Sequence, residues 1–266
     1  HQLGEWLSDD MYLPIHCGKA LSDSDLAVQG DDTGDNISLK NRNYCELTAL
    51  YWAWKNLKDV DFIGLCHYRR YFSKQDSTWL AKELKCKHTF REIRNEILDA
   101  KHILQALETH DIILPKQRCR PVSLKDDYIY QHIPEDYAIL RQTVRDIYPD
   151  YLFSFDYVMG NTHKLSCYNM FVTKKILADE YCEWLFRILF EVEKRIKLSA
   201  YPYQARVFGF MSERLLNVYC YHHALRVAYK PVLFVTDAPD YSALAYSFRN
   251  IRNTVLFKLS ELDFRS

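Results

Sequence analysis

The stretch Val60-Asp61-Phe62-Ile63-Gly64-Leu65-Cys66-His67-Tyr68-Arg69-Arg70 decides the fold class of this chain. Its apolar part is short and has polar residues on both sides, which is typical of a strand buried inside a sheet. The strand ends abruptly in a histidine, a tyrosine and two arginines. Ligands of α/β sheets bind beyond the carboxyl ends of the strands, so these polar residues are candidates for a binding site.

Helical patterns alternate with further short apolar stretches along the chain. Asn43, with Glu46 three residues later, predicts a capped helix that runs to about Leu57. The remaining predicted helices are 90–109, 135–148, 180–196 and 208–222, and the remaining predicted strands are 111–115, 167–173 and 227–235, the last broken at Pro231. This alternation predicts an α/β domain whose mostly parallel central sheet carries helices on both faces.

The composition excludes several classes of protein. With 35 basic and 35 acidic residues among 266, the chain has no net charge to attract nucleic acid. Its eight cysteines are scattered without a Cys-x-x-Cys pair, which favours reduced thiols in a cytoplasmic protein. No apolar run reaches the ~18 residues that a membrane-spanning helix needs.

The segment His67-Tyr68-Arg69-Arg70 is the strongest candidate for chemistry. Arginine presents a planar fork of donors that fits phosphate oxygens. A diphosphate leaving group develops negative charge, and fixed cations can stabilise that charge. We therefore expect Tyr68, Arg69 and Arg70 to bind a phosphorylated donor and His67 to be a catalytic residue; the alternative is a solvated basic turn.

The polar loop 31–38 is a second candidate. It carries Asp31, Asp32, Asp35 and Asn36, whose oxygens could bind a cation or recognise the base and ribose of a nucleotide. The alternative is an ordinary capped turn, because Asp, Asn and Gly favour such turns.

Four later residues complete the set of candidates. His163 and Asn169 flank a predicted strand and could meet sugar hydroxyls, whereas Arg206 and Glu213 lie at the start of a predicted helix. Glu213 could act as a general base, with His163 as the alternative. The structural interpretations are a core histidine, a turn asparagine and a carboxylate that the helix dipole favours.

The chain lacks several familiar motifs. It contains no dinucleotide or P-loop glycine motif, no Gly-x-Ser-x-Gly and no His-Glu-x-x-His, and no Asp-x-Asp follows an apolar strand. Two other functions stay open. One is a nucleotide-sugar or glycan-binding module without turnover. The other is a metal-dependent hydrolase built from Asp31, Asp32, His67, His132 and His163.

Three segments, 31–38, 44–56 and 63–72, resemble a bacterial family of capsular polysaccharide or exopolysaccharide glycosyltransferases. That family has long been classed as a domain of unknown function, and related domains act as galactofuranosyltransferases in O-antigen synthesis. The resemblance covers roughly residues 10–235. It implies a Rossmann-like fold of the GT-A type and a UDP-sugar donor. The transferred hexose would be galactose or galactofuranose, and the acceptor a polysaccharide or lipid-linked glycan.

The resemblance also bears on the cofactor and on the start of the domain. Enzymes of the GT-A type hold a metal through Asp-x-Asp near the place where this chain has His67 to Arg70, so we expect metal-independent transfer without a cofactor. Family members open with a short strand ending in Thr-His-Lys. Here His1 would be that histidine, followed by Gln2, and the strand itself would lie upstream.

The glycosyltransferase domain is predicted to span 1–236, and a helical tail to span 237–266. The tail carries an apolar stripe beside basic residues. The stripe consists of Phe248, Ile251, Val255, Leu256 and Leu259, and the basic residues are Arg249, Arg252 and Lys258. It could touch the inner membrane surface weakly, pack on the core of the protein, or join two subunits of a homodimer.

Overall fold

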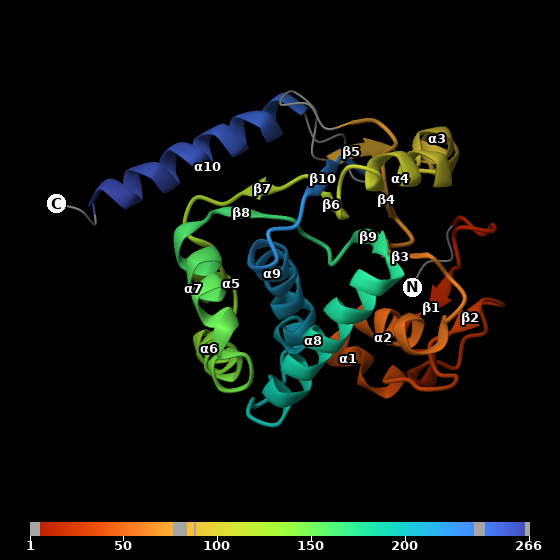
Figure 1. Cartoon of the computed structure of the whole chain (residues 1–266), viewed down its shortest axis with the longest axis horizontal. Helices are drawn as coiled ribbons and strands as arrows, with labels where there is room; N and C mark the ends of the chain where they lie inside the picture. The colour runs from red at the N-terminus through yellow and green to blue at the C-terminus, as the bar shows by residue number, and fades with distance from the viewer. Residues whose placement is uncertain (1–5, 77–83, 88, 237–242, 264–266) are drawn as a thin grey trace.

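The computed structural model describes residues 6–76, 84–87, 89–236 and 243–263 (Figure 1). A four-stranded sheet lies at its centre, in the order β10-β6-β9-β3. These strands are β3 (Phe62–Leu65), β6 (Ile112–Pro115), β9 (Phe171–Lys174) and β10 (Val227–Lys230). The predicted strands therefore form at the expected places in the sequence.

The sheet is mixed, so the expectation of a mostly parallel sheet was wrong. β10 runs parallel to β6, whereas β9 runs antiparallel to both β6 and β3. A helix between two strands permits a parallel crossover but does not dictate it. The strand direction depends on the end at which the chain re-enters the sheet, and tertiary packing decides that end.

Helices cover both faces of the sheet, as predicted. Strand β6 shows the alternation that produces two apolar faces: Ile112 and Leu114 join one core cluster, and Ile113 joins the other. The first cluster is formed with α2 (Leu47–Asn56), α8 (Lys175–Glu193) and α9 (Val207–His222), and the second with α4 (Ala100–Leu107).

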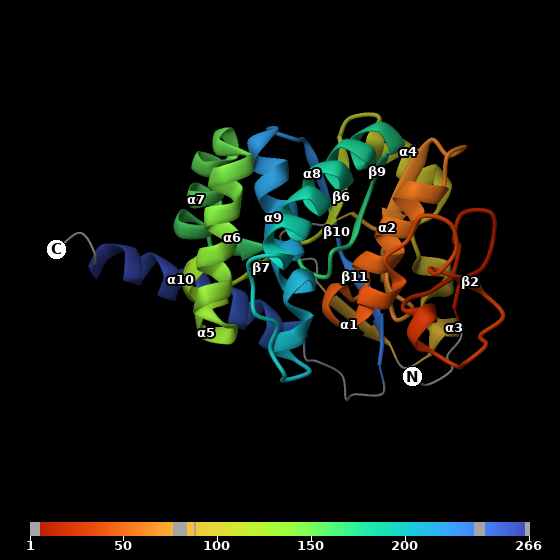
Figure 2. The same ribbon diagram turned by 90° about the horizontal axis from the view of Figure 1, so that it is seen from below.

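Three more helices pack beside α8 and α9, away from the sheet (Figure 2). They are α5 (Leu124–Gln131), α6 (Pro134–Ile147) and α7 (Leu152–Asn161). The helices predicted at 135–148, 180–196 and 208–222 are confirmed by α6, α8 and α9.

Two predicted helices are interrupted. The first is split into α1 (Asn41–Tyr44) and α2, because Cys45 between them has a φ of 52°. Glu46 consequently forms no capping box; its Oε1 accepts a hydrogen bond from Asn169 Nδ2 at 2.8 Å. The second, predicted at 90–109, is divided into α3 (Phe90–Ile93), the 3-10 turn η3 (Arg94–Glu96) and α4.

Smaller sheets surround the central one. β11 (Val232–Val235) pairs antiparallel with β4 (Arg70–Phe72) and parallel with β5 (Leu84–Lys87), and Pro231 separates β10 from β11 as predicted. Two short pairs are β1 (Ile15–His16) with β2 (Gln29–Gly30) and β7 (Arg118–Cys119) with β8 (Lys164–Leu165). The other 3-10 turns are η1 (Lys19–Leu21), η2 (Ser38–Lys40), η4 (Pro149–Tyr151) and η5 (Gln204–Arg206).

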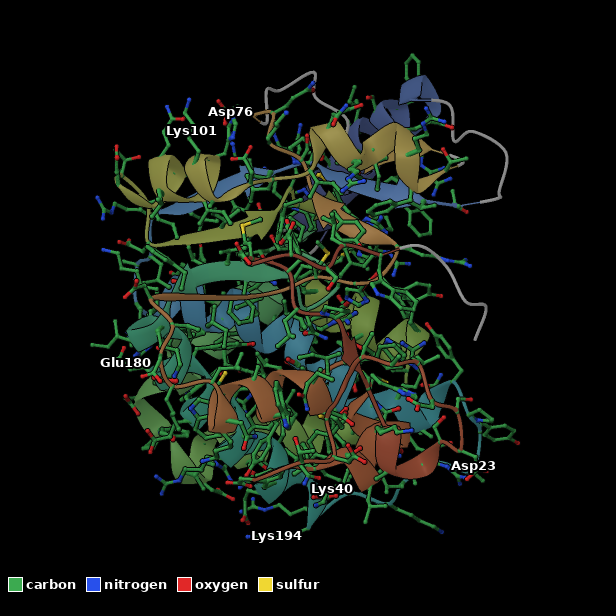
Figure 3. The ribbon with its side chains drawn as sticks, turned by 90° about the vertical axis from the view of Figure 1, so that its right-hand side faces the viewer. Asp23, Lys40, Asp76, Lys101, Glu180 and Lys194 are labelled. Carbon is green, nitrogen blue, oxygen red and sulfur yellow. The ribbon has the colours of Figure 1, made fainter. Side chains whose placement is uncertain are left out.

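The last helix, α10 (Ala243–Asp263), lies beside β7 and extends beyond the rest of the protein (Figure 1). None of the helices in the described part of the chain is long and apolar enough to cross a membrane. Charged side chains such as Lys40, Lys101, Glu180 and Lys194 lie at the periphery (Figure 3). The seven cysteines whose side chains are described are all free thiols.

Candidate active site

The segment His67–Arg70 forms a tight turn between β3 and β4. His67 N donates to Arg70 O and Arg70 N donates to His67 O, both at 3.0 Å. Residues directly opposite each other in an antiparallel pair place their side chains on the same face. His67 and Arg70 therefore project together, while Tyr68 and Arg69 occupy the turn. Arg69 packs over the exposed Tyr68 ring, so the predicted arginine pair is divided.

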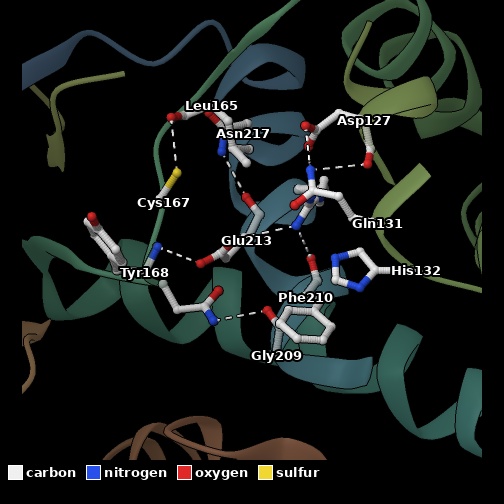
Figure 4. A network of polar contacts seen from close by, with 12 residues as sticks. Asp127, Gln131, His132, Leu165, Cys167, Tyr168, Gly209, Phe210, Glu213 and Asn217 are labelled. Carbon is white, nitrogen blue, oxygen red and sulfur yellow. Dashed lines mark hydrogen bonds and ion pairs between the residues drawn. The ribbon is translucent and has the colours of Figure 1, made fainter. Parts of the chain in front are cut away.

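His67 and Arg70 face a strained turn at Tyr168 and Asn169. These two residues have φ values of 77° and 55°, a conformation that L residues adopt at a cost. Contacts on both sides hold the turn. His67 Nε2 lies 2.7 Å from Tyr168 O. On the other side, Glu213 Oε1 accepts from Tyr168 N at 2.7 Å (Figure 4). Strain of this kind persists where the surroundings over-determine it, and it clusters at functional sites.

Asn169 connects this turn to the start of α2. Its Nδ2 donates to Glu46 Oε1 at 2.8 Å and to Gly209 O at 3.1 Å, and the side chain is buried. Next to Glu46, Arg206 Nε donates to the sulfur of Cys45 at 3.2 Å. Asn169 and Arg206 therefore contact the break at Cys45 and Glu46, and the sequence did not single out Glu46.

Two arginines share the ring of Tyr168. The guanidinium carbon of Arg70 lies 4.7 Å from the ring centroid, and that of Arg118 lies 4.8 Å away. Arg118 also donates a short hydrogen bond to the Tyr168 hydroxyl. Burial, and then the charge of Arg118, lower the pKa of Arg70. The fold thus holds two guanidinium groups together against their mutual repulsion.

Several buried polar atoms at this place have no hydrogen-bond partner. They are Arg70 Nε, Arg120 Nε and Asn169 Oδ1, judged over the described part of the chain. An unmet buried donor costs free energy, so each such atom in a native structure requires an explanation. Arg120 Nε lies 3.7 Å from Asp127 Oδ2, whereas Arg70 Nε, beside the Tyr168 ring, is the donor that an anion bound at this ring could satisfy.

His67 and Glu213 differ in how their polar atoms are used. A carbonyl oxygen only accepts, so His67 Nε2 must carry the proton that it shares with Tyr168 O. Burial lowers the pKa of His67, which favours a neutral ring, and Nδ1 makes no hydrogen bond to any described residue. Glu213 already holds Tyr168 N through Oε1, and its Oε2 lies 3.4 Å from Arg214 Nη1. Burial raises the pKa of Glu213.

A buried network lies behind Glu213 (Figure 4). Arg214 Nη2 donates to Asp127 Oδ2 at 3.1 Å, and Gln131 Nε2 donates to Asp127 Oδ1 at 2.6 Å. One turn further along α9, the Asn217 amide exchanges two hydrogen bonds of 3.1 Å with the backbone of Ser166. The buried face of α9 therefore fixes the segment that leads into the Tyr168 turn.

The loop 31–38 is a structural turn that makes none of the contacts described above. Asp31 is buried; it accepts from the backbone of Gly18 and Lys19, and from Ser38 Oγ at 2.5 Å, which leaves little capacity for a ligand. Asp35 Oδ1 accepts from Tyr51 OH and Asn36 Oδ1 from Ser38 N. Asp32 is exposed. The turn alternative thus accounts for the polar residues of this loop.

The two other predicted histidines lie elsewhere. The ring of His163 stacks on Phe257 of α10 at 4.3 Å, and the ring of His132 stacks on Phe210 at 4.1 Å. The five residues of the hydrolase hypothesis therefore do not form one group. Across the described residues, no three His, Cys, Asp or Glu side chains gather in a way that could hold a metal.

Sequence reasoning missed Glu46, Arg118, Arg120 and Tyr168. Arg118 and Arg120 could have been predicted, because they follow strand 111–115 at the carboxyl end where ligands of such sheets bind. Tyr168 and Glu46 could not have been predicted, because the break at Cys45 and the two left-handed residues leave no signal in the sequence.

The chain is similar to one protein of known structure. That structure is described as the WbbM bifunctional glycosyltransferase in its apo form. The similarity has a TM-score of 0.77 and a sequence identity of 31% over 91% of this chain. The chain spans about half of the solved protein, 46% of its length. No curated protein matches the chain.

Residues 1–224 match a protein family described as a domain of unknown function, DUF4422. The match covers most of the chain and includes the three segments on which the resemblance was based, so the predicted relationship is confirmed. The chain belongs to this DUF4422 family, whose fold is like that of a part of a bifunctional glycosyltransferase.

Proposed function

We propose that the chain is a glycosyltransferase that moves a hexose from a UDP-sugar to a polysaccharide or lipid-linked glycan acceptor. The similarity to part of a bifunctional glycosyltransferase supports the class of reaction. The resemblance to capsule and O-antigen enzymes favours galactose or galactofuranose as the hexose.

One observation carries the proposal: the cation cluster formed by Arg70 and Arg118 at the ring of Tyr168. The two guanidinium groups share that ring, and Arg70 Nε is buried without a hydrogen-bond acceptor. A donor diphosphate would supply an acceptor to this atom and would neutralise the repulsion between the arginines. Fixed cations would then stabilise the charge on the departing UDP, so we expect transfer without a metal.

His67 fits the role of general base better than Glu213 or His163. Its Nε2 is held by the Tyr168 carbonyl, so a neutral ring has its lone pair at Nδ1, where it could accept the proton of an acceptor hydroxyl. Glu213 would instead be a positioning residue, because its Oε1 holds Tyr168 N. The ring of His163 stacks on Phe257 of α10, and its Nε2 lies 3.4 Å from Thr254 Oγ1 of the same helix.

The cation cluster can be tested by measuring UDP binding calorimetrically, with and without EDTA. We expect Arg70→Gln and Arg118→Gln each to weaken UDP binding by about 10- to 100-fold, the scale of a charge-assisted hydrogen bond. Arg187→Gln is a matched control, because Arg187 lies over the Tyr148 ring on the exposed side of α8. We expect EDTA to have no effect on binding or transfer.

Wild-type UDP affinity in both cluster variants would refute the role of the arginines. UDP binding without sugar transfer or hydrolysis, over a broad panel of glycan acceptors, would favour the alternative of a binding module without turnover.

A further inference from the structure

Polar side chains hold α10 on the protein. Asn253 Nδ2 donates to Cys119 O at 2.9 Å, and Asn250 Oδ1 accepts from Cys119 N at 3.3 Å. Phe257 is the buried apolar contact of this face and stacks on His163. These three residues, at helical spacing, fix which side of α10 faces β7.

The opposite side of α10 carries large apolar side chains that nothing in the described structure covers. Phe248, Ile251, Val255, Leu256 and Leu259 are between 43% and 67% exposed. Phe248, Ile251, Val255 and Leu259 follow one another at intervals of three or four residues, so they form a continuous stripe. Of the three alternatives for the tail, packing of this stripe on the described core of the protein is therefore wrong, and a membrane surface and a second subunit remain.

The charges of α10 favour an anionic surface as the occupant of this stripe. Residues 247–260 carry Arg249, Arg252 and Lys258 and no acidic residue, and the acids of the helix are confined to Glu261 and Asp263 in its last turn. At 100° per residue, Arg252 and Lys258 lie on opposite flanks of the stripe. Cations in this position can reach lipid phosphates while the apolar side chains enter the acyl boundary.

The same charges disfavour a second copy of the chain. In an antiparallel pair of α10 helices each flank would face the same flank of the other copy, so Arg252 would face Arg252 and Lys258 would face Lys258. In a parallel pair the two basic flanks would also face each other. Like charges across a helix interface are destabilising.

We propose that α10 binds an anionic lipid surface through this stripe and its basic flanks. The inference does not depend on the proposed sugar transfer. Its test is flotation of the 266-residue chain with phosphatidylcholine vesicles that contain or lack phosphatidylglycerol. We expect flotation with the anionic vesicles, weakened at high salt because the electrostatic part is screened.

Two pairs of substitutions separate the contributions. Ile251→Ser with Val255→Ser, and Arg252→Gln with Lys258→Gln, should each reduce the bound fraction at least 10-fold. The matched control is Ile176→Ser on α8, where Ile176 is 70% exposed, and it should float like the wild type. Because the stripe is exposed, all these variants should keep the wild-type Tm.

Three results would overturn the proposal. The first is an absence of flotation with anionic vesicles at low salt. The second is a lowered Tm in the stripe variants, which would show that the stripe packs within the protein. The third is a concentration-dependent dimer, seen by sedimentation and abolished by Ile251→Ser with Val255→Ser, which would assign the stripe to a second copy.

Discussion

The ion pair between Asp127 and Arg214 permits a prediction of stability with a worked magnitude. The two side chains are 6% and 3% exposed, and Arg214 also donates to Phe210 O. Asp127→Ala would remove the carboxylate that lies 3.1 Å from Arg214 and 3.7 Å from Arg120. It would leave Arg214 the weaker contact with Glu213 Oε2, at 3.4 Å. Breaking a buried pair in this way costs about 3–5 kcal/mol. In a chain of this size that corresponds to a fall in Tm on the order of 10 °C.

The measurement is thermal unfolding followed by circular dichroism, together with urea unfolding at 25 °C. The matched control is Asp156→Ala, because Arg141 donates to both oxygens of Asp156, at 2.7 and 2.6 Å. That pair is exposed, with side chains 39% and 41% accessible. Its loss should cost less than about 1 kcal/mol.

A double variant distinguishes the cost of an unpaired charge from the net contribution of the pair. Replacing both Asp127 and Arg214 by leucine removes the two charges together, so it should destabilise the protein less than Asp127→Ala alone. If Asp127→Ala costs no more than Asp156→Ala, the buried pair is not what holds α5 against α9, and the reasoning fails.

Three further predictions concern single positions. Burial lowers the pKa of His132 in the folded protein to about 4. Between pH 4 and pH 6.5 this histidine is therefore protonated more in the unfolded chain than in the folded protein. As the pH falls through this range, up to ~3 kcal/mol of the free energy of unfolding is lost. His132→Phe, measured by urea unfolding from pH 4 to pH 7, should remove that part of the dependence. The rate of sugar transfer by Glu213→Gln should stay within about 10-fold of the wild-type rate, whereas His67→Gln should lower that rate by about 100-fold or more. Both variants should bind UDP like the wild type. If Glu213→Gln lowers the rate more than His67→Gln does, Glu213 is the base. Gly160→Ala should raise the free energy of unfolding by about 0.5 kcal/mol, because its new methyl group meets no atom within 4 Å and alanine favours helix. Gly64→Ala should lower the free energy of unfolding, because its methyl group would lie 2.6 Å from a carbonyl oxygen of β9.

The sequence predicted the elements of the fold better than their directions. Residues 112–115 are apolar throughout, and the structure buries both faces of this strand, as such a pattern indicates. The helices predicted at 135–148, 180–196 and 208–222 form nearly as predicted, because their apolar residues recur at helical spacing over long segments. Helices α5 and α7 were not predicted. The antiparallel direction of β9 had no local signal, since it depends on how the chain returns from α7 through β8.

The tail shows the limit of periodicity as a guide to packing. The pattern at Phe248, Ile251 and Val255 correctly indicated an amphipathic helix. It did not indicate which face is buried, because the face that binds β7 is formed by Asn250, Asn253 and Phe257. Amide side chains can satisfy the unpaired backbone of a two-residue strand, and an aliphatic stripe cannot.

In the candidate site, too, the sequence did not indicate which way each side chain points. His67, Tyr68, Arg69 and Arg70 are consecutive, and nothing in their order distinguishes the directions of their side chains. The hydrogen bonds between His67 and Arg70 close a two-residue turn, and that closure places Arg70 over the Tyr168 ring and Arg69 over the Tyr68 ring. The second cation at the Tyr168 ring then comes from β7, about 50 residues further along the chain. A phosphate site made in this way is defined by the shared ring and not by an arginine doublet. For that reason Arg70 and Arg118, rather than Arg69 and Arg70, are the pair whose substitution should weaken UDP binding.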